Sequence, residues 1–363
     1  MCGINGIISN TNKDETSLSN QLAVMNQLIF HRGPDEDGFY TSVTESASVA
    51  MAMRRLSIID LSTGKQPMYS NDNKIGIVFN GEIYNYRLLK NQLQNSGVTF
   101  KTTSDTEVIL KLYEQKGVDA FKELDGMFAF SIHDKIKNKV YIARDFFGEK
   151  PLYYTKTKTD FIYGSELKSI LKHVPNKPDI CKEGLNLYFR LTYIPAPYSI
   201  YKDIFKLSSN HYIDFDLASD SFAIHEIEKQ KPIEKQQISF NDAKKKVHDS
   251  VMASVESRSI ADVSLGTFLS GGVDSSVVTH CLAEISAEKI ETFSIGFEKK
   301  GFDETDKSQV IAKLVNSNHH EFIVKEEDFK DGIDEILLNF DEPFADSSAP
   351  VSYTHLTLPT IQL

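Results

Sequence analysis

The stretch VSLGTFLSGGVDSSVVTHCLAEI, residues 263–285, combines three local patterns. Its first seven residues are largely apolar or β-branched, as in a buried strand, and residues 277–285 have the composition of a helix. A second strand-like run, ETFSIGF, follows at 291–297. A strand, a loop, a helix and a strand in this order form a parallel βαβ unit. This half of the chain therefore predicts an α/β domain with a parallel sheet.

The loop of this unit, SGGVDSS at 270–276, has the residues that a phosphate-binding turn needs. Gly271 and Gly272 allow positive φ and a close approach of the backbone to an anion. The serine hydroxyls would flank the N-terminus of the following helix, where free N–H groups point outward. The lysine of the GxxxxGK[ST] loop is absent, so a loop that cleaves a γ-phosphate is not the match. The alternative is a glycine pair that only makes a tight turn.

Upstream of this unit the chain predicts a helix and, before it, connecting material. Apolar residues recur every four positions after the capping residue Ser239 and predict a helix with a buried stripe: Ala243, Val247, Val251 and Val255. Between about 174 and 238, proline-rich and charged stretches are typical of a connecting segment. A length of 363 residues fits two domains.

Residues 1 to about 165 have the short strands and turns of a compact mixed sheet system. KIGIVFN (74–80) alternates apolar residues and predicts a half-buried strand that runs into a turn at Asn80-Gly81. SDTEVILKLYEQKG (104–117) begins with a capping-box pair and ends at a glycine, which predicts a helix. Apolar residues three and four apart predict another helix: Leu18, Leu22, Met25 and Ile29.

Composition excludes several classes of protein. The chain is 40% hydrophobic and 25% charged, as in soluble globular proteins, and its net charge of -11 argues against a nucleic-acid partner, which needs a basic face. Cys2, Cys181 and Cys281 lie far apart, so neither a zinc site nor a disulfide framework is predicted. This fits a reducing cytosol. No signal peptide and no long apolar run is present, so we expect no membrane span and a cytoplasmic location.

At the other end of the chain, MCGINGI (1–7) raises the question of whether Cys2 becomes a nucleophilic first residue once Met1 is removed. A lone cysteine beside a start codon is unremarkable in itself. Each residue that could act together with Cys2 also has a purely structural interpretation when it is considered alone. Arg55 suits a surface charge, Asn80-Gly81 a hairpin turn, and Asp105 an acid near a helix N-terminus.

Taken together, these residues have the chemistry to cleave an amide. A thiol nucleophile needs a base, and the α-amino group of Cys2, with an ordinary pKa of about 8, would serve. The side-chain N–H of Asn80 and the backbone N–H of Gly81 would hold the oxyanion. A free amino-acid substrate carries a carboxylate, which suits the fork of Arg55. It also carries an ammonium, which suits Asp105 or Glu82.

Six strings behind Cys2 resemble class II glutamine amidotransferase domains, which are N-terminal nucleophile hydrolases: HRGPD (31–35), RRLSIID (54–60), NGEIYN (80–85), SDTE (104–107), RDFFGEKPLYY (144–154) and GSELKS (164–169). The resemblance covers about residues 2–170. It implies a four-layer αββα fold with two antiparallel sheets, and a cysteine that releases ammonia from the side-chain amide of glutamine. The catalytic residues that it implies are Cys2, Asn80 and Gly81. The glutamine-binding residues that it implies are Arg55, Asn80, Gly81, Glu82 and Asp105.

The loop SGGVDSS resembles the PP-loop of the ATP pyrophosphatases, which split ATP between the α and β phosphates and leave an adenylylated substrate. The resemblance implies a Rossmann-like domain, with Asp274 as a candidate ligand of magnesium. GFDE (301–304) resembles the acidic turn that follows the adenine-contacting strand end near Ile295. The ATP-binding residues that it implies are Leu269, Ser270, Gly271, Gly272, Asp274, Ser275, Ser276 and Ile295.

Together, the two halves resemble glutamine-hydrolysing asparagine synthase. The implied organisation is a glutaminase domain at 2–170, a connecting segment at 171–238 and the N-terminal part of an ATP-binding domain at 239–350. The implied reaction amidates aspartate through a β-aspartyl-AMP intermediate, with ammonia from glutamine. The resemblance further implies Mg-ATP as co-substrate, no prosthetic group, and a homodimer among the expected assemblies.

The end of the chain departs from this pattern. DEPFADSSA (341–349) fits the family, but PVSYTHLTLPTIQL (350–363) does not, and the SGEGxDE-type loop that contacts ATP is absent. We therefore expect an incomplete second domain followed by a foreign tail at 351–363. Three alternatives stay open: a glutaminase alone, amidation of another carboxylate, and a non-catalytic nucleotide-binding module.

Overall fold

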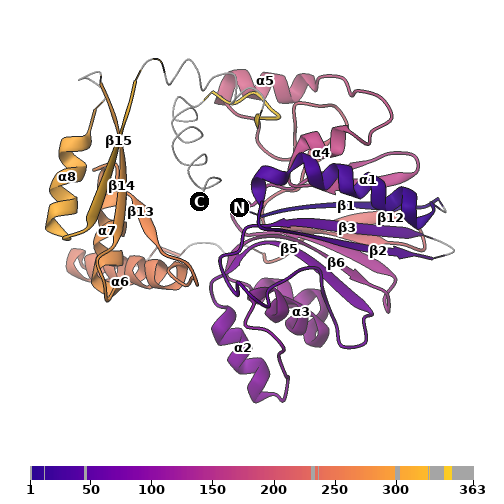
Figure 1. Cartoon of the computed structure of the whole chain (residues 1–363), viewed down its shortest axis with the longest axis horizontal. Coiled ribbons are helices and arrows are strands. Elements are labelled where there is room, and N and C mark those ends of the chain that lie inside the picture. Colours follow the sequence, from indigo (N-terminus) through magenta and orange to yellow (C-terminus); the bar gives the residue numbers. More distant parts are fainter. Residues whose placement is uncertain are drawn as a thin grey trace. The chain divides into compact units, whose positions relative to one another are not determined.

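The computed structural model describes residues 2–11, 13–44, 47–229, 234–235, 237–298, 303–325, 327 and 339–345. The chain divides into two compact units (Figure 1). The first holds Met1–Gln230 together with Phe340–Ala345, and the second holds Lys231–Asn339 and Asp346–Leu363. The foreign tail expected at 351–363 lies outside the described residues.

The first unit contains two antiparallel sheets. One sheet has the strand order β10-β8-β9-β1-β3-β2. Its strands are β1 (Gly3–Ser9), β2 (Glu36–Val43), β3 (Ser48–Arg55), β8 (Tyr153–Lys156), β9 (Asp160–Gly164) and β10 (Phe205–Lys206). The N-terminal strand β1 is buried along its whole length and pairs with β3 on one side and β9 on the other. Cys2 therefore stands at the end of an internal strand.

The other sheet of this unit has the order β12-β11-β7-β6-β5-β4. Its strands are β4 (Met68–Tyr69), β5 (Ile75–Ile83), β6 (Gly126–Asp134), β7 (Lys139–Arg144), β11 (His211–Asp216) and β12 (Ser221–Glu226). The strand predicted after Lys74 is confirmed, but it is buried on both faces rather than half-buried, and the predicted turn at Asn80-Gly81 is wrong. Strand β5 continues to Ile83, because Asn80, Gly81 and Glu82 pair in register with Ala129, Phe128 and Met127 of β6.

Helices cover the outer faces of both sheets (Figure 1). The first sheet is covered by α1 (Glu15–Leu28) and α4 (Leu167–Leu171), and the second by α3 (Asp105–Lys116), against which α2 (Tyr86–Asn95) packs. Two short 3-10 helices, η1 (Phe30–Arg32) and η2 (Gly117–Glu123), complete these layers. One apolar core lies between the sheets, and another lies between the first sheet and its helices. The predicted αββα architecture is confirmed.

Two predicted helices of this unit are confirmed, with one correction to a cap. The predicted apolar face of α1 is fully buried. Helix α3 begins after Ser104, whose hydroxyl accepts the N–H of Thr106, and ends at Gly117, which has a positive φ of 60°. Glu107 does not close the capping box, because its carboxylate instead accepts hydrogen bonds from the preceding loop at Lys101 and Thr102.

The interval 171–238, predicted as a connecting segment, holds α5 (Lys182–Leu191) and the strands β10, β11 and β12. Ile213 and Phe215 of β11 are buried in the core between the two sheets. Apolar and polar residues alternate in HYIDFD (211–216), as in a strand, but the prolines and charges on either side are typical of a connecting segment. The first unit accordingly extends to Gln230.

The second unit has a three-stranded parallel sheet of order β13-β14-β15. Its elements are α6 (Phe240–Arg258), β13 (Gly266–Phe268), α7 (Val273–Ile285), β14 (Glu291–Phe297), α8 (Thr305–Leu314) and β15 (Asn318–Val324). The parallel βαβ unit is confirmed. The buried stripe on α6 is not, since no residue of α6 is buried and Val247 is 63% exposed. Among the described elements α6 packs chiefly on α7, which covers only part of its surface.

Among the described residues, no helix has the length and apolarity to cross a membrane.

Candidate active site

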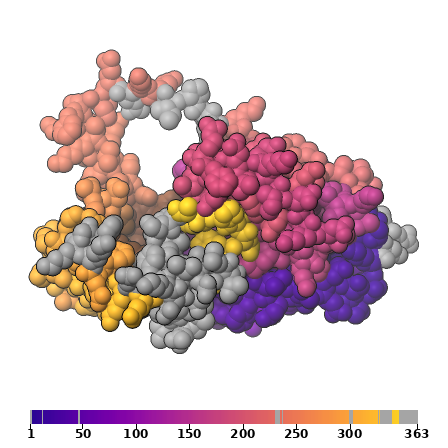
Figure 2. All heavy atoms as spheres, turned by 90° about the horizontal axis from the view of Figure 1, so that it is seen from above, coloured from indigo at the N-terminus to yellow at the C-terminus, as the bar shows by residue number. Residues whose placement is uncertain are grey.

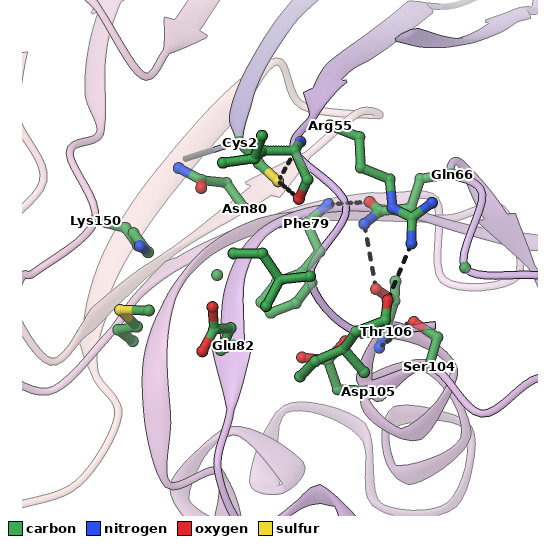
Figure 3. Close-up of a pocket in the computed structure, with 16 residues that line it drawn as sticks. Cys2, Arg55, Gln66, Phe79, Asn80, Glu82, Ser104, Asp105, Thr106 and Lys150 are labelled. Carbon is green, nitrogen blue, oxygen red and sulfur yellow. Dashed lines mark hydrogen bonds between the residues drawn. The ribbon is translucent and has the colours of Figure 1, made fainter. Parts of the chain in front are cut away.

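A cavity of about 240 Å³ in the first unit collects the residues that the sequence singled out. Cys2 precedes β1, Arg55 ends β3, Asn80 to Glu82 lie in β5, and Asp105 begins α3. All six predicted residues line the cavity (Figure 3). Further lining residues are Leu56, Ile58, Ile59, Gly64, Gln66, Phe79, Ser104, Thr106, Met127 and Lys150.

The thiol of Cys2 faces this cavity and is held by one backbone segment. Its Sγ accepts the N–H of Leu56 at 3.3 Å and lies 3.5 Å from the carbonyl oxygen of the same residue. Burial raises the pKa of Cys2 above its usual value, although the Leu56 hydrogen bond and the charges of Lys150 and Arg55 oppose this. Because the thiol stays protonated near neutral pH, it needs a base to become a nucleophile.

Asn80 lies beside Cys2 and is fully buried (Figure 3). Neither its Nδ2 nor its Oδ1 has a hydrogen-bond partner within the part of the chain that the structure describes. A buried polar group without a partner costs about 1–3 kcal/mol, so it indicates a place where a ligand supplies the missing bond.

Gly81 follows Asn80 at a point where two strands lie very close together. A Cβ atom at this position would lie 2.0 Å from the carbonyl oxygen of Met127 on β6. Only glycine therefore keeps this part of β5 in register beside the cavity.

Two carboxylates stand at the opposite side of the cavity from Cys2 (Figure 3). Burial, together with the nearby charge of Glu82, raises the pKa of Asp105 to about 7. The Asp105 carboxylate accepts the N–H of Ile83 at 3.1 Å. Burial also raises the pKa of Glu82, against the charge of Lys150. Two desolvated acids side by side gain from a cation between them, such as an ammonium group.

Arg55 lies in the cavity wall with its guanidinium in a fixed orientation. Nη1 donates to Glu36 at 2.9 Å, and Nη2 donates to the carbonyl oxygens of Ile59 at 3.0 Å and Asp60 at 2.6 Å. A Cβ at Gly64 would lie 2.4 Å from Nη2, so glycine is needed there too. From the sequence, the whole guanidinium of Arg55 was expected to be available to a substrate carboxylate. Because these bonds use several of its N–H groups, fewer donors remain for the substrate.

Lys150 belongs to the cavity but was not among the predicted residues. It ends a loop that the buried carboxylate of Asp145 organises. Asp145 accepts backbone N–H groups of Phe147 at 3.1 Å, Glu149 at 2.9 Å and Lys150 at 3.0 Å. The string RDFFGEKPLYY contained this loop, but its letters do not reveal which side chain faces the cavity.

Gln66 is a second residue that the sequence did not single out. Its Oε1 accepts the N–H of Phe79 at 2.7 Å, and its Nε2 donates to Thr106 at 3.2 Å. It therefore joins β5 to the first turn of α3 at the cavity. No local pattern marks a glutamine for this role.

SGGVDSS (270–276) follows β13 in the second unit and runs into the first turn of α7, which begins at Val273. Gly271 has a positive φ of 79°, and a Cβ there would lie 2.5 Å from the Cβ of Lys307. The hydroxyls of Ser275 and Ser276 donate to the carbonyl oxygen of Gly272 at 3.1 and 2.7 Å. The oxygens of Ser270 and Ser275 lie 3.0 Å apart. The serines thus hold the loop together internally.

The remaining predicted ATP-binding residues are Leu269, which precedes the string, Asp274, which lies within it, and Ile295, which lies in β14. Leu269 is buried and its N–H donates to the carbonyl oxygen of Phe293 on β14, two residues before Ile295. Asp274 is exposed in the first turn of α7. The described residues contain no group of three histidine, cysteine or acidic side chains that would hold a metal by themselves. A single carboxylate fits a magnesium ion that arrives with the phosphates of ATP.

Two family models match the chain. One, described as a glutamine amidotransferase domain, covers residues 1–226, and the other, described as asparagine synthase, covers residues 246–358. Among solved structures, a glutamine phosphoribosylpyrophosphate amidotransferase of B. subtilis complexed with ADP and GMP is 17% identical. It matches over 88% of this chain and 65% of that one, with a TM-score of 0.46.

Curated relatives match along nearly the whole chain. It is 40% identical to a putative glutamine-hydrolysing asparagine synthetase 2 of Methanocaldococcus jannaschii, over 97% of this chain and 70% of that protein. It is 36% identical to asparagine synthetase 1 of Bacillus subtilis, over 96% of this chain and 54% of that protein. It is 28% identical to asparagine synthetase B of Escherichia coli, over 94% of this chain and 57% of that protein.

This chain therefore spans little more than half the length of the B. subtilis and E. coli proteins. The glutamine amidotransferase model nevertheless covers more than half of this chain, and the M. jannaschii similarity extends across both units. The chain belongs to the glutamine-hydrolysing asparagine synthetase family.

Proposed function

We propose that the first unit hydrolyses glutamine with Cys2 as nucleophile, and that the ammonia serves an ATP-dependent amidation of aspartate to asparagine. The observation that carries this proposal is the pairing of the Cys2 thiol with a buried Asn80 amide that has no partner among the described residues. A thiol attacking an amide generates an oxyanion, and an unpartnered N–H donor beside the sulfur stabilises it.

The proposed reaction begins with proton transfer from the Cys2 thiol to the α-amino group of the same residue, which removal of Met1 would expose. The sulfur attacks the side-chain carbonyl carbon of glutamine, and the oxyanion accepts hydrogen bonds from Asn80 Nδ2 and the N–H of Gly81. The α-ammonium group of Cys2 returns its proton to the amide nitrogen, which leaves as ammonia. Water then cleaves the thioester and releases glutamate.

The two ends of glutamine meet complementary charges in the cavity. Its ammonium fits between the desolvated carboxylates of Asp105 and Glu82, and its α-carboxylate fits beside Arg55. Binding the ammonium lowers the cost of keeping both acids ionised, which gives free glutamine an advantage over a glutamine residue inside a peptide.

The second unit is proposed to take ATP, with magnesium, on the loop 270–276. The β-carboxylate of aspartate would attack the α-phosphate, giving β-aspartyl-AMP and pyrophosphate, and ammonia would then displace AMP. Gly271 and Gly272 would admit the phosphates, and Asp274 would meet the magnesium ion. Support comes from the parallel strand–loop–helix arrangement, the exposed loop and the asparagine synthase family match.

One coupled assay tests this proposal. The purified chain receives glutamine, aspartate and Mg-ATP, and glutamate, pyrophosphate and asparagine are measured together. Equal yields of the three support the full reaction. Glutamate alone supports a glutaminase, and pyrophosphate with a different amide supports another carboxylate acceptor. Absence of all three products, with ATP still bound, supports a non-catalytic nucleotide-binding module.

A further inference from the structure

The segment Phe340–Ala345 belongs to the first unit, although it lies within the region that matches the asparagine synthase model. Figure 2 shows it in yellow against the magenta surface of that unit. Its Glu342 is nearly buried and accepts hydrogen bonds from the Ile200 N–H at 2.8 Å and the Tyr153 hydroxyl at 3.1 Å. Lys206 Nζ lies 2.6 Å from the same carboxylate. The segment is therefore specifically docked.

The neighbouring acid of this segment reaches a different part of the unit. The Asp341 carboxylate accepts the backbone N–H of Lys168 at 2.9 Å, and its other oxygen lies 3.5 Å from Lys168 Nζ. The same Nζ lies 3.0 Å from Glu166 Oε2. One ammonium group is thus shared between Asp341 and Glu166.

Glu166 in turn holds the arginine that fixes the nucleophile's backbone. Arg32 Nη1 donates to Glu166 Oε1 at 3.0 Å, and Arg32 Nε donates to the carbonyl oxygen of Cys2 at 2.9 Å. His31 Nε2 lies 2.8 Å from the same Oε1. Burial opposes the charge of Glu166, but His31, Arg32 and Lys168 together hold its pKa at about 2, so it stays ionised.

Packing allows little freedom in this connection. A Cβ at Gly3 would lie 2.9 Å from Arg32 Cδ, so the arginine stem lies directly against the start of β1. Ser165, which precedes Glu166, donates to and accepts from the backbone of Ile4 at 2.9 Å in both bonds. The string GSELKS therefore fixes the backbone of Ile4 directly and that of Cys2 through Arg32.

We propose that Asp341 is a positioning residue for Cys2, acting through Lys168, Glu166 and Arg32. This inference rests on the proposed glutaminase function. Without the Asp341 charge, Lys168 draws the Glu166 carboxylate toward itself and weakens its hold on Arg32. The Cys2 carbonyl then loses a fixed partner, and the thiol adopts its reactive orientation less often. Glutamine binding is unaffected, because Arg55, Glu82 and Asp105 belong to other elements.

Two matched variants of the whole chain test this proposal. Asp341→Asn and Glu342→Gln each remove one charge from the same segment and keep acceptors for the backbone donors. We expect Asp341→Asn to lower kcat of glutamine hydrolysis about 5- to 20-fold with KM unchanged within twofold. Glu342→Gln should retain kcat within about twofold. The alkylation rate of Cys2 by iodoacetamide should fall with kcat.

A double-mutant cycle separates positioning from mere support of the fold. Lys168→Met alone should retain kcat within about twofold, and the double variant should recover the kcat lost in Asp341→Asn, since no ammonium group then draws Glu166 away from Arg32. Equal losses in Asp341→Asn and Glu342→Gln, with lowered Tm in both, would show a structural role and overturn the inference. Wild-type kcat in Asp341→Asn would also overturn it. An active Cys2→Ala enzyme would instead overturn the proposed function.

Discussion

The two candidate sites differ in whether their polar groups already have hydrogen-bond partners before a ligand binds. In the cavity around Cys2, the buried Asn80 amide has no partner among the described residues, and the two acids have raised pKa values. The loop 270–276 is largely exposed, and its serine hydroxyls already bond to one another or to the loop backbone. One site carries unmet polar groups inside the protein, and the other has its polar groups satisfied at the surface.

This difference follows from the ligands that the two sites are proposed to take. An uncharged amide reacts only where a desolvated nucleophile and a fixed hydrogen-bond donor are held in place. The folded protein therefore keeps polar groups buried without partners before the substrate binds, which lowers its stability. A triphosphate brings several charges and its own magnesium ion, which attract backbone N–H groups and hydroxyls strongly enough to rearrange an exposed loop. The cavity is therefore expected to be more sensitive to substitution.

The largest effect is expected from Cys2→Ala. Removing the nucleophile should lower the rate of glutamate release at least about 10⁴-fold. ATP binding, measured by calorimetry, should not change, because the loop 270–276 belongs to the second unit. Cys181→Ser is the matched control, since that thiol caps α5 and does not line the cavity. Glutaminase activity that survives Cys2→Ala would contradict the proposed nucleophile.

A smaller loss is expected from Asn80→Ala. The variant removes the unpartnered donor and should reduce kcat about 10²- to 10³-fold, with little change in KM, because the bond forms with the oxyanion rather than the ground-state amide. The variant should also lose less thermal stability than other truncations of core side chains, since it removes a buried amide that has no hydrogen-bond partner among the described residues. A change confined to KM would contradict the oxyanion role.

The contrast between the sites also explains how much of each the sequence could predict. The phosphate loop is continuous in sequence, and its glycine pair follows a strand and opens a helix, so local rules predicted its conformation. The positive φ of Gly271 bears this out, whereas Gly272 has an ordinary φ of -70°. The cavity around Cys2 is assembled from separate strands, and the chemistry of Cys2, Asn80 and Asp105 predicted that they belong together, without predicting their distances.

What local patterns could not predict in the first unit depends on long-range pairing. Asn80-Gly81 has the letters of a hairpin turn, but pairing with β6 overrides this local preference. Lys150 faces the cavity because the buried Asp145 gathers the backbone of its loop. The docking of Asp341 on Lys168 joins residues 173 positions apart, which no window of sequence can reveal.

Asp105→Asn is expected to have an effect on binding rather than on the chemical step. Losing one charge-assisted contact to the substrate ammonium should weaken glutamine binding about 10- to 100-fold. In a Cys2→Ala background, binding should strengthen as pH rises through about 7, where Asp105 ionises, and this dependence should vanish in the Asn variant. Glu82→Gln is the matched control, because the pH dependence due to Asp105 should persist in it.

The same variant has a stability signature with a defined sign. Asp105 has a pKa of about 7 when folded and about 3.8 when unfolded, so the folded state binds more protons between these values. Folding stability due to this group therefore falls as pH rises from about 4 to 7. Asp105→Asn should match wild-type Tm near pH 4 and exceed it by pH 8. A wild-type advantage at pH 8 would show that the charged form is stabilised in the fold.

The smallest effect is expected in the exposed loop, where two adjacent glycines serve different purposes. Gly271→Ala places a Cβ at positive φ and 2.5 Å from Lys307, which costs about 1–2 kcal/mol and should lower Tm. Gly272 has a φ of -70° and room for a Cβ, whose nearest neighbour would be Ser270 Oγ at 3.4 Å. Gly272→Ala should therefore retain Tm.

ATP affinity then separates loop strain from phosphate contact. Both variants should bind ATP about tenfold more weakly, Gly271→Ala because the loop shifts and Gly272→Ala because its methyl group obstructs a phosphate. Glutaminase activity should be unchanged in both. If Gly272→Ala binds ATP as wild type does, the phosphates do not approach this backbone, and the glycine pair serves the turn alone.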